Sequence, residues 1–222
     1  MRALIVNADD FGLASGVNDG IIEAHHAGVV TSGSLMVERP SAAEAAGLAR
    51  RHPALSVGLH FDDHRAAAGE LDDPSWTARE FARQLERFRA LVGAEPTHVD
   101  SHHHVHLDAR RIATFKRLVA PLAVPLRGAG RVAYIGAFYA RRHGGGTELE
   151  RVGRRSLLGL IESQTGAALS ELGCHPGRVS DDLTSSYLRE REAELQTLTS
   201  PGLRQAIEDL GVRLVSYRVC HH

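Results

Sequence analysis

Short apolar runs alternate along this chain with segments in which apolar residues recur at helical spacing. The runs predict strands at residues 3–6, 34–37, 55–59, 97–100, 124–126, 169–174 and 212–217. The periodic segments predict helices at residues 16–28, 42–51, 77–92, 108–119, 148–164, 187–195 and 201–210. Gly28 is expected to cap the first helix and Thr77 to begin the third, while residues 62–75, 128–146 and 177–186 are expected to be irregular.

Strands that alternate with helices indicate a parallel sheet. About seven strands within 222 residues favour an α/β fold of the distorted (β/α) barrel type, with a doubly wound open sheet as the alternative. We find no repeat at solenoid spacing and no linker in the sequence. We therefore expect residues 1–222 to form a single domain.

Composition narrows the class of protein. An apolar content of 43% and a charged content of 24% exclude wholesale disorder. The net charge of -1 comes without a basic block, so we expect no nucleic-acid partner. Two cysteines suit a reducing compartment, and the apolar run at residues 3–6 is too short for a signal peptide or a membrane span. A cytoplasmic protein without a membrane partner is expected.

The unusual feature is histidine, with 14 residues in all, and its position matters more than its number. Asp9 and Asp10 follow the first predicted strand, and His60 follows the third. A histidine-rich run, residues 102–106, begins where the fourth strand ends, and His175 ends the sixth. Ligand sites of parallel α/β folds lie at the carboxyl ends of strands, so these groups are expected to converge there.

These residue types suit metal-dependent hydrolysis. Two imidazoles and a carboxylate from different strands can hold a divalent ion and leave positions open for water and substrate. In an extended backbone Asp9 and Asp10 would point in different directions, so that one binds metal and the other accepts a proton. His175 is a candidate general acid.

Simpler interpretations exist for each group. An Asp-Asp pair after a strand is often a turn or a helix cap, and a histidine run can be a surface tract that binds metal adventitiously. If the strand continued, alternation would place the even-numbered residues 98–106 on one face. The histidines assigned to surface or loop positions are His25, His26, His52, His64 and His143.

Several motifs together are more specific. They are NADDFGL at 7–13, NDGIIEA at 18–24, GVVTS at 28–32, VGLH at 57–60, PTHVDSHHHVH at 96–106, CHP at 174–176 and SYR at 216–218. In this order they closely resemble the YdjC-like carbohydrate deacetylases, a family that includes chitooligosaccharide deacetylases and hopanoid-associated proteins. The resemblance implies a NodB-like distorted barrel and removal of an N-acetyl group from an amino sugar.

Carried over residue by residue, the resemblance implies Asp10, His60 and His102 as ligands of one divalent metal ion. Family precedent favours Mg²⁺, whereas the ligand types favour Zn²⁺. Asp9 would deprotonate a metal-bound water that attacks the acetamide, and His175 would protonate the departing amine. The residues expected to contact substrate or support these groups are Asp100, His104, His106, Arg127 and Tyr139.

The chain departs from the family pattern after His60, where Phe61-Asp62-Asp63-His64 replaces an apolar residue and a threonine or asparagine. The loop that follows is short, so the resemblance does not fix the sugar, and a homodimer could complete the pocket. Two other functions are compatible with the residues. One is an amidohydrolase or phosphoesterase, suggested by the His-x-His pairs within residues 102–106; the other is a non-enzymatic histidine-rich metal-binding protein.

Overall fold

The computed structural model describes residues 2–142 and 145–220. Its strands are β1 (Arg2–Phe11), β2 (Ser32–Leu35), β3 (Ser56–Phe61), β4 (Val99–Ser101), β5 (Ala133–Ile135), β6 (Leu169–Cys174) and β7 (Val212–Val215). Its α-helices are α1 (Ser15–His26), α2 (Ala42–Arg51), α3 (Pro74–Val92), α4 (Ile112–Val119), α5 (Arg154–Ser163), α6 (Arg189–Leu198) and α7 (Leu203–Asp209). Short 3₁₀ helices are η1 (Glu70–Asp72), η2 (His102–Leu107), η3 (Ala120–Leu122), η4 (Leu149–Val152) and η5 (Tyr217–Cys220).

The strands form one sheet in the order β4-β3-β2-β1-β6-β5, with β7 paired to β1, and every named strand pair is parallel. The long β1 is the centre. It pairs with β6 over residues 3–8, so β7 and β2 share its other edge, β7 over residues 2–5 and β2 over residues 7–11. Strands that diverge from one edge curl the sheet into a distorted, incompletely closed barrel. The predicted α/β class and parallel barrel type are confirmed.

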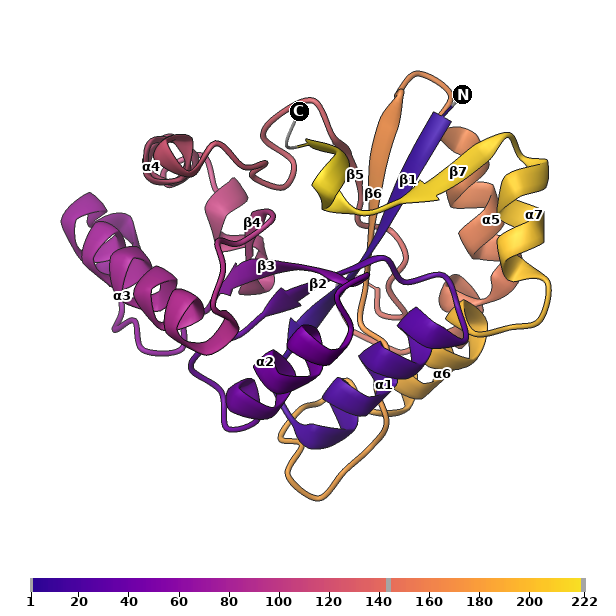
Figure 1. The fold of residues 1–222 in the computed structure, drawn as a ribbon, viewed down its shortest axis with the longest axis horizontal. Helices are drawn as coiled ribbons and strands as arrows, with labels where there is room; N and C mark the ends of the chain where they lie inside the picture. Colours follow the sequence, from indigo (N-terminus) through magenta and orange to yellow (C-terminus); the bar gives the residue numbers. More distant parts are fainter. Residues whose placement is uncertain (1, 143–144, 221–222) are drawn as a thin grey trace.

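The helices cover the outside of the curled sheet. In Figure 1, α1, α2 and α6 lie together on one side, α3 and α4 lie beyond β3, and α5 and α7 lie side by side next to β7. Apolar side chains of β1, β2 and β3 meet those of the helices in one large core, which includes Phe11, Ile21, Leu35, Leu59 and Phe88. Burial of these side chains fixes the strands whose ends carry the polar residues.

The first strand is longer than predicted, because β1 continues through Asn7, Asp9 and Asp10 to Phe11. All of these residues are buried, and the polar ones are hydrogen-bonded inside the protein. A polar run normally indicates a strand end because an unpaired buried polar group is costly. Here buried partners from other elements supply the hydrogen bonds, and a local sequence pattern cannot show them.

The predicted strand at residues 124–126 is wrong. That segment makes one isolated bridge, between Leu126 and Val99, and the fifth strand is instead β5, within the segment expected to be irregular. Pairing with β6 places β5 there. The predicted helix at residues 148–164 is interrupted at Gly153, whose φ of -77° and ψ of 160° are extended, so η4 and α5 are separate.

Two predicted caps are also wrong. Helix α1 ends at His26 with Ala27 as its C-cap. Gly28 is required by close packing instead, since a Cβ there would lie 2.3 Å from the Leu198 carbonyl oxygen. Helix α3 begins one turn earlier than predicted, with Asp73 accepting a hydrogen bond from the Ser75 amide at 2.9 Å. Pro74 occupies the first turn of that helix, where its missing N–H costs nothing.

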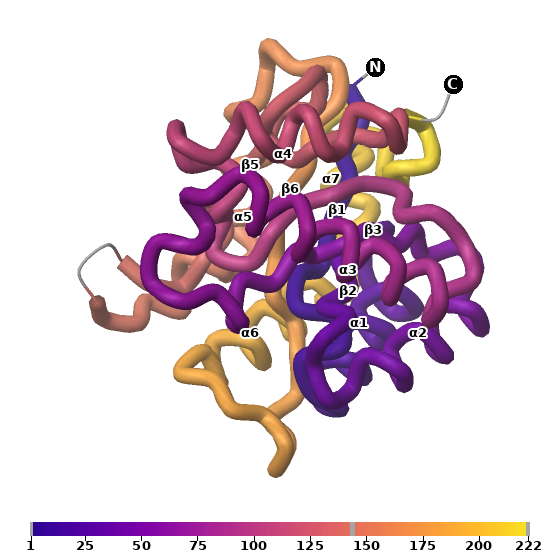
Figure 2. The backbone as a smooth tube through the Cα atoms, turned by 90° about the vertical axis from the view of Figure 1, so that its left-hand side faces the viewer, coloured from indigo at the N-terminus to yellow at the C-terminus, as the bar shows by residue number. Residues whose placement is uncertain are grey.

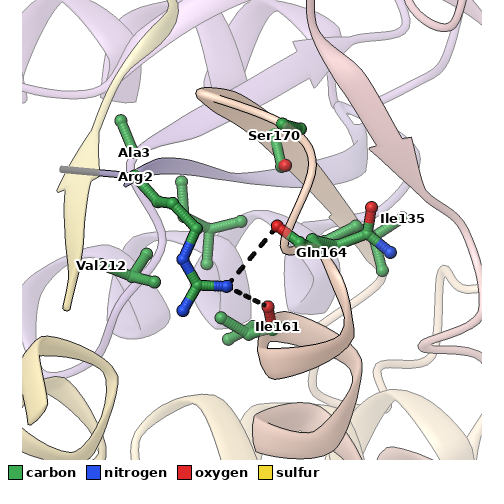
Figure 3. Close-up of a pocket in the computed structure, with 9 residues that line it drawn as sticks. Arg2, Ala3, Ile135, Ile161, Gln164, Ser170 and Val212 are labelled. Carbon is green, nitrogen blue, oxygen red and sulfur yellow. Dashed lines mark hydrogen bonds between the residues drawn. The ribbon is translucent and has the colours of Figure 1, made fainter. Parts of the chain in front are cut away.

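The amino end of the barrel is closed by protein. Arg2, at the start of β1, lies among Ile161, Gln164 and Val212, and its guanidinium contacts the carbonyl oxygens of Ile161 and Gln164 (Figure 3). Another donor reaches the Leu210 carbonyl at 2.8 Å. The remaining space is about 10 Å³, room for a single water. The start of β1 and η5 lie at the same end of the molecule in both views (Figures 1 and 2).

None of the helices within the described ranges is long and apolar enough to cross a membrane.

Candidate active site

A β-bulge turns two adjacent carboxylates toward the same cavity. The pairing of β1 with β2 shifts register between Ala8 and Phe11, and Asp10 has a φ of 68°. Left-handed backbone is strained for a residue other than glycine and is common at functional sites. As a result Asp9 and Asp10 both line a cavity of about 700 Å³, within the range of small-molecule sites. The extended backbone on which the expectation of different directions depended is absent at Asp10, and the two carboxylates bind different partners, Asp9 binding Arg127 and Asp10 binding Arg191.

The histidine run does not continue as a strand. After Ser101 the chain turns into η2, in which His103 and His104 adopt left-handed φ values of 52° and 54°. Alternation along a strand therefore does not apply. His102, His103 and His104 line the cavity. His106 is buried away from it, hydrogen-bonded to the Ser101 hydroxyl and the Arg127 carbonyl.

Asp10, His60 and His102 converge as a possible metal site. Asp10 Oδ1 lies 3.6 Å from His60 Nε2 and 3.3 Å from His102 Nδ1. Ligands bound at about 2.0–2.1 Å in a tetrahedral zinc site are about 3.3 Å apart. Asp10 Oδ1 and His60 Nε2 are buried and make no hydrogen bond to any described residue. Unpaired buried atoms of ligating type, so spaced, fit a divalent cation.

Neighbouring residues hold these ligands in place. His60 Nδ1 contacts Asp100 at 2.7 Å, which turns Nε2 toward Asp10. Burial alone would lower the pKa of His60, but the charge of Asp100 outweighs it and raises the pKa to about 9. Arg191 donates to Asp10 Oδ2 at 2.5 Å. Burial alone would raise the pKa of Asp10, yet Arg191 and the nearby histidines hold it well below its usual value.

Asp9 is held by a buried arginine. Arg127 donates two hydrogen bonds of 2.7 Å to the Asp9 carboxylate, and it also contacts Asp100 at 2.7 Å and Glu171 at 2.6 Å. Burial would raise the pKa of Asp9, but Arg127 outweighs it and the pKa is lowered. Asp9 therefore stays ionised beside the proposed metal ligands. Asp100 and Arg127, both expected as supporting or substrate residues, are completely buried and do not line the cavity. They contact the side chains of His60 and Asp9, which do line it.

His175 lies on the other side of Asp9, directly after β6. Its Nε2 is 3.9 Å from Asp9 Oδ2, and its Nδ1 is 3.9 Å from Glu194 Oε1. Glu194 also accepts hydrogen bonds from the His175 backbone amide at 2.5 Å and from the Tyr187 hydroxyl at 2.6 Å. Burial lowers the pKa of His175 to about 4 and raises that of Glu194 to about 8.

The remaining wall of the cavity is aromatic. Tyr139, expected to contact substrate, lines the cavity and stacks on Tyr187 with ring centroids 4.7 Å apart. Tyr134 also lines the cavity and contacts His104 Nε2 at 3.2 Å. Aromatic faces of this kind favour the apolar face of a ring-shaped ligand.

Sequence reasoning missed Arg191 and Glu194, which α6 carries into the site. A helix as polar as α6 is typical of a solvent-exposed element, so its sequence gives no signal that both side chains are buried. The surface or loop assignment holds for His26 and His64, which are exposed, and for the partly exposed His25 and His52. His143 lies outside the described residues.

Comparisons with known proteins agree with this architecture. Residues 3–209 match the family model described as YdjC-like protein. The chain is 36% identical to a carbohydrate deacetylase of Geobacillus stearothermophilus, over 98% of this chain and 97% of that protein. It is also 36% identical to a chitooligosaccharide deacetylase of Yersinia enterocolitica, over 99% of each.

Two solved structures share the fold. A putative cellobiose-phosphate cleavage protein from Enterococcus faecalis superposes with a TM-score of 0.85 and 27% identity, over 98% of each chain. A family 4 carbohydrate esterase from Streptomyces lividans, in complex with acetate, gives a TM-score of 0.61 at 12% identity, over 98% of this chain and 94% of that one. The second likeness confirms the predicted NodB-like fold. By its sequence, its fold and its motifs, the chain belongs to the YdjC-like protein family.

Proposed function

We propose that this protein is a metal-dependent carbohydrate deacetylase that hydrolyses the N-acetyl group of an amino sugar or oligosaccharide. The observation that carries the proposal is the pair of unpaired buried atoms, Asp10 Oδ1 and His60 Nε2, beside an ionised Asp9 and across from His175. The activities of the two named relatives support the same substrate class.

Asp10, His60 and His102 would hold one divalent cation, Mg²⁺ or Zn²⁺, because carboxylate and imidazole ligands accept both. When bound, the cation lowers the pKa of a water and polarises the acetamide carbonyl. The second group of ligand-type atoms, Asp9, His60 and Asp100, does not suit a cation, because the Arg127 guanidinium already lies between its carboxylates. One ion per chain is therefore proposed.

Asp9 would accept the proton of the attacking water. Its Oδ1 is occupied by hydrogen bonds from Asn7 and Arg127, whereas Oδ2 receives one hydrogen bond, from Arg127, and faces His175. Oδ2 is thus the oxygen with room for a proton. The Arg127 contact keeps the carboxylate ionised and fixes its plane.

His175 would donate a proton from Nε2 to the nitrogen of the departing amine. Because burial lowers the pKa of His175 to about 4, protonation of its ring requires a nearby anion, and the ionised Asp9 lies 3.9 Å from Nε2. Water is consumed, the amide C–N bond breaks, and acetate and a free amine leave. We propose Glu194 as a positioning residue that fixes the His175 ring.

The direct test is acetate release from N-acetylglucosamine and acetylated chitooligosaccharides, with the protein loaded with Mg²⁺ or Zn²⁺. Phosphate esters and cyclic amides are assayed alongside, since turnover of those alone would favour the phosphoesterase or amidohydrolase alternative. Metal stoichiometry of His60→Ala and His102→Ala addresses the storage alternative. Loss of the single site in both variants is expected, whereas several weak sites that persist would contradict the proposal.

A further inference from the structure

Arg39 lies in the turn after β2 and lines the cavity. Its side chain is 25% exposed and lines the cavity together with His102 and His103. No part of the mechanism proposed above uses it. Within the described part of the chain, its side chain is hydrogen-bonded and ion-paired to Asp62 and to none of the proposed metal ligands or acid–base residues.

Asp62 holds Arg39 in a defined orientation. Arg39 Nη2 donates to Asp62 Oδ1 at 3.0 Å, and Nε lies 2.6 Å from Oδ2. The Asp62 side chain is completely buried, and its carboxylate also accepts the His64 backbone amide at 3.1 Å. Only the Nη2 contact has hydrogen-bond geometry. The Nε contact is an ion-pair contact on the same edge of the guanidinium, and His64 Nδ1 lies 3.0 Å from the same Asp62 oxygen.

Asp62 is itself fixed by helix α3. The Gln84 side chain accepts a hydrogen bond from the Asp62 amide at 2.9 Å and donates one to the Asp62 carbonyl at 2.7 Å. Gln84 is fully buried. Asp62 lies in the segment after His60 where the sequence departs from the family pattern. The departure thus creates a rigid buried anchor for a cavity arginine.

Part of the Arg39 guanidinium is not used by Asp62. With Nε and Nη2 engaged by Asp62, the two N–H groups of Nη1 have no hydrogen-bond partner within the described part of the chain. The Nη1 and Nη2 edge forms a fork suited to two adjacent oxygen atoms. Because Asp62 compensates the charge of Arg39, the fork favours neutral oxygen acceptors more than an additional anion.

We propose that Arg39, anchored by Asp62, is a specificity-determining residue that binds neighbouring hydroxyl groups of the saccharide at a distance from its acetamide. The inference rests on the proposed function for the position of the acetamide and assigns a further lining residue of the same cavity. Pre-ordering by Asp62 reduces the entropy lost when the sugar binds.

The test compares Arg39→Gln, Arg39→Lys and Asp62→Asn with Arg89→Gln. Arg89 is the matched control, because it pairs with Glu95 through the same Nε and Nη2 edge on the outer surface and does not line the cavity. Affinity for N,N'-diacetylchitobiose is measured by calorimetry in a metal-loaded Asp9→Asn background. KM and kcat are measured with Asp9 intact.

Arg39→Gln is expected to weaken binding and raise KM by about 10- to 100-fold with a smaller change in kcat, as for loss of a charged hydrogen bond. Arg39→Lys should not restore affinity, since an ammonium lacks the fork, and Arg89→Gln should match the parent. If Arg39→Lys bound the saccharide as tightly as the parent, and this affinity depended strongly on salt concentration, simple charge attraction would explain the binding. The proposed two-point contact with hydroxyl groups would then be overturned.

The inference and the proposed function can fail separately. Unchanged affinity and KM in Arg39→Gln, in a protein that releases acetate, would overturn the role of Arg39 alone. Arg39-dependent saccharide binding without acetate release from the parent would support the subsite and overturn the deacetylase proposal. If Arg39→Gln lowered kcat and the unfolding temperature together, with KM unchanged, Arg39 would have a structural role and the inference would be overturned.

Discussion

Arg127 donates two hydrogen bonds of 2.7 Å to the Asp9 carboxylate, and the same guanidinium contacts the carboxylates of Asp100 and Glu171. The buried Arg127 guanidinium thus compensates the charge of three carboxylates from three different strands, β1, β4 and β6. The arrangement links the proposed base to the residue that orients His60. Charge balance in the core and geometry at the site therefore depend on one side chain.

Arg127→Met is expected to lower the free energy of unfolding by about 3–5 kcal/mol, because it leaves buried carboxylates without their counter-charge. Denaturant unfolding measures the loss. Arg178→Met is the control, since Arg178 forms an exposed pair with Glu23 and should change stability little. Equal unfolding midpoints for the two variants would contradict the role assigned to Arg127.

Asp9→Asn should reduce turnover by about 10²- to 10⁴-fold, the usual contribution of a general base. Metal binding should persist, because Asp9 is not among the three proposed ligands. Acetate release and metal calorimetry on the same preparation check both parts. A metal-loaded Asp9→Asn protein with normal turnover would remove Asp9 from the mechanism.

Metal binding should release about one proton per ion near pH 7, because His60, with its pKa raised to about 9, is protonated in the metal-free protein. Affinity should therefore rise with pH by up to about tenfold per unit until about pH 9. Calorimetry in buffers of different ionisation enthalpy counts the proton. The test covers roughly pH 6.5 to 8.5, which lies between the ordinary pKa of histidine and the raised pKa of His60. A metal affinity that does not change over this range would contradict the prediction.

The raised pKa of His60 also makes the stability of the metal-free protein fall as pH rises, whereas metal affinity rises with pH. The folded pKa of His60 lies above its unfolded value, so its contribution to stability is fully present below about pH 6.5 and is lost as pH rises through about 9. Thermal unfolding of the metal-free protein at several pH values should show this loss. In His60→Ala the contribution should be absent.

Glu194→Gln should lower kcat by about ten- to a hundredfold with little change in KM, because the amide nitrogen of Gln cannot accept a hydrogen bond, so either the His175 backbone amide or the Tyr187 hydroxyl loses its acceptor. The groups that face His175 are Asp9, Arg191, Tyr139, Tyr187 and Glu194. Glu194, with its pKa raised to about 8, becomes an anion that favours protonated His175 only above that pH, so the alkaline limb of the rate profile should move to lower pH in the variant. An unmoved limb would leave Glu194 with a structural role only.

Gly58→Ala should destabilise the protein by about 1–3 kcal/mol through overpacking. A Cβ at Gly58 would lie 2.5 Å from the His98 ring, which is hydrogen-bonded to Ser34 and stacked on Tyr217. Gly33→Ala in the neighbouring strand is the matched control, because its Cβ would have no neighbour closer than 3.5 Å. Thermal unfolding of the pair measures the difference, and equal losses would count against the His98 contact.

Much of the candidate site could be predicted from strand ends. Asp9, Asp10, His60, His102 and His175 fall at one edge of a parallel sheet, and the structure brings all five to one cavity. The one-domain organisation and the homodimer stay predictions. Strand β5 and the break at Gly153 could not be found, because pairing with β6 and helix packing are long-range effects that short apolar patterns do not encode.

The sequence by itself determined the alternation of strands and helices, the parallel α/β class, the family motifs and the set of ionisable residues at the strand ends. Those properties depend on local periodicity and residue type. The tertiary structure decided which atoms meet. At the bulge of β1, Asp9 and Asp10 both line one cavity, the turn into η2 separates His102 from His106, and α6 brings Arg191 and Glu194 to the site from far along the chain. Such contacts arise from backbone geometry and from the compensation of buried charge, and both exist only once distant segments are packed together.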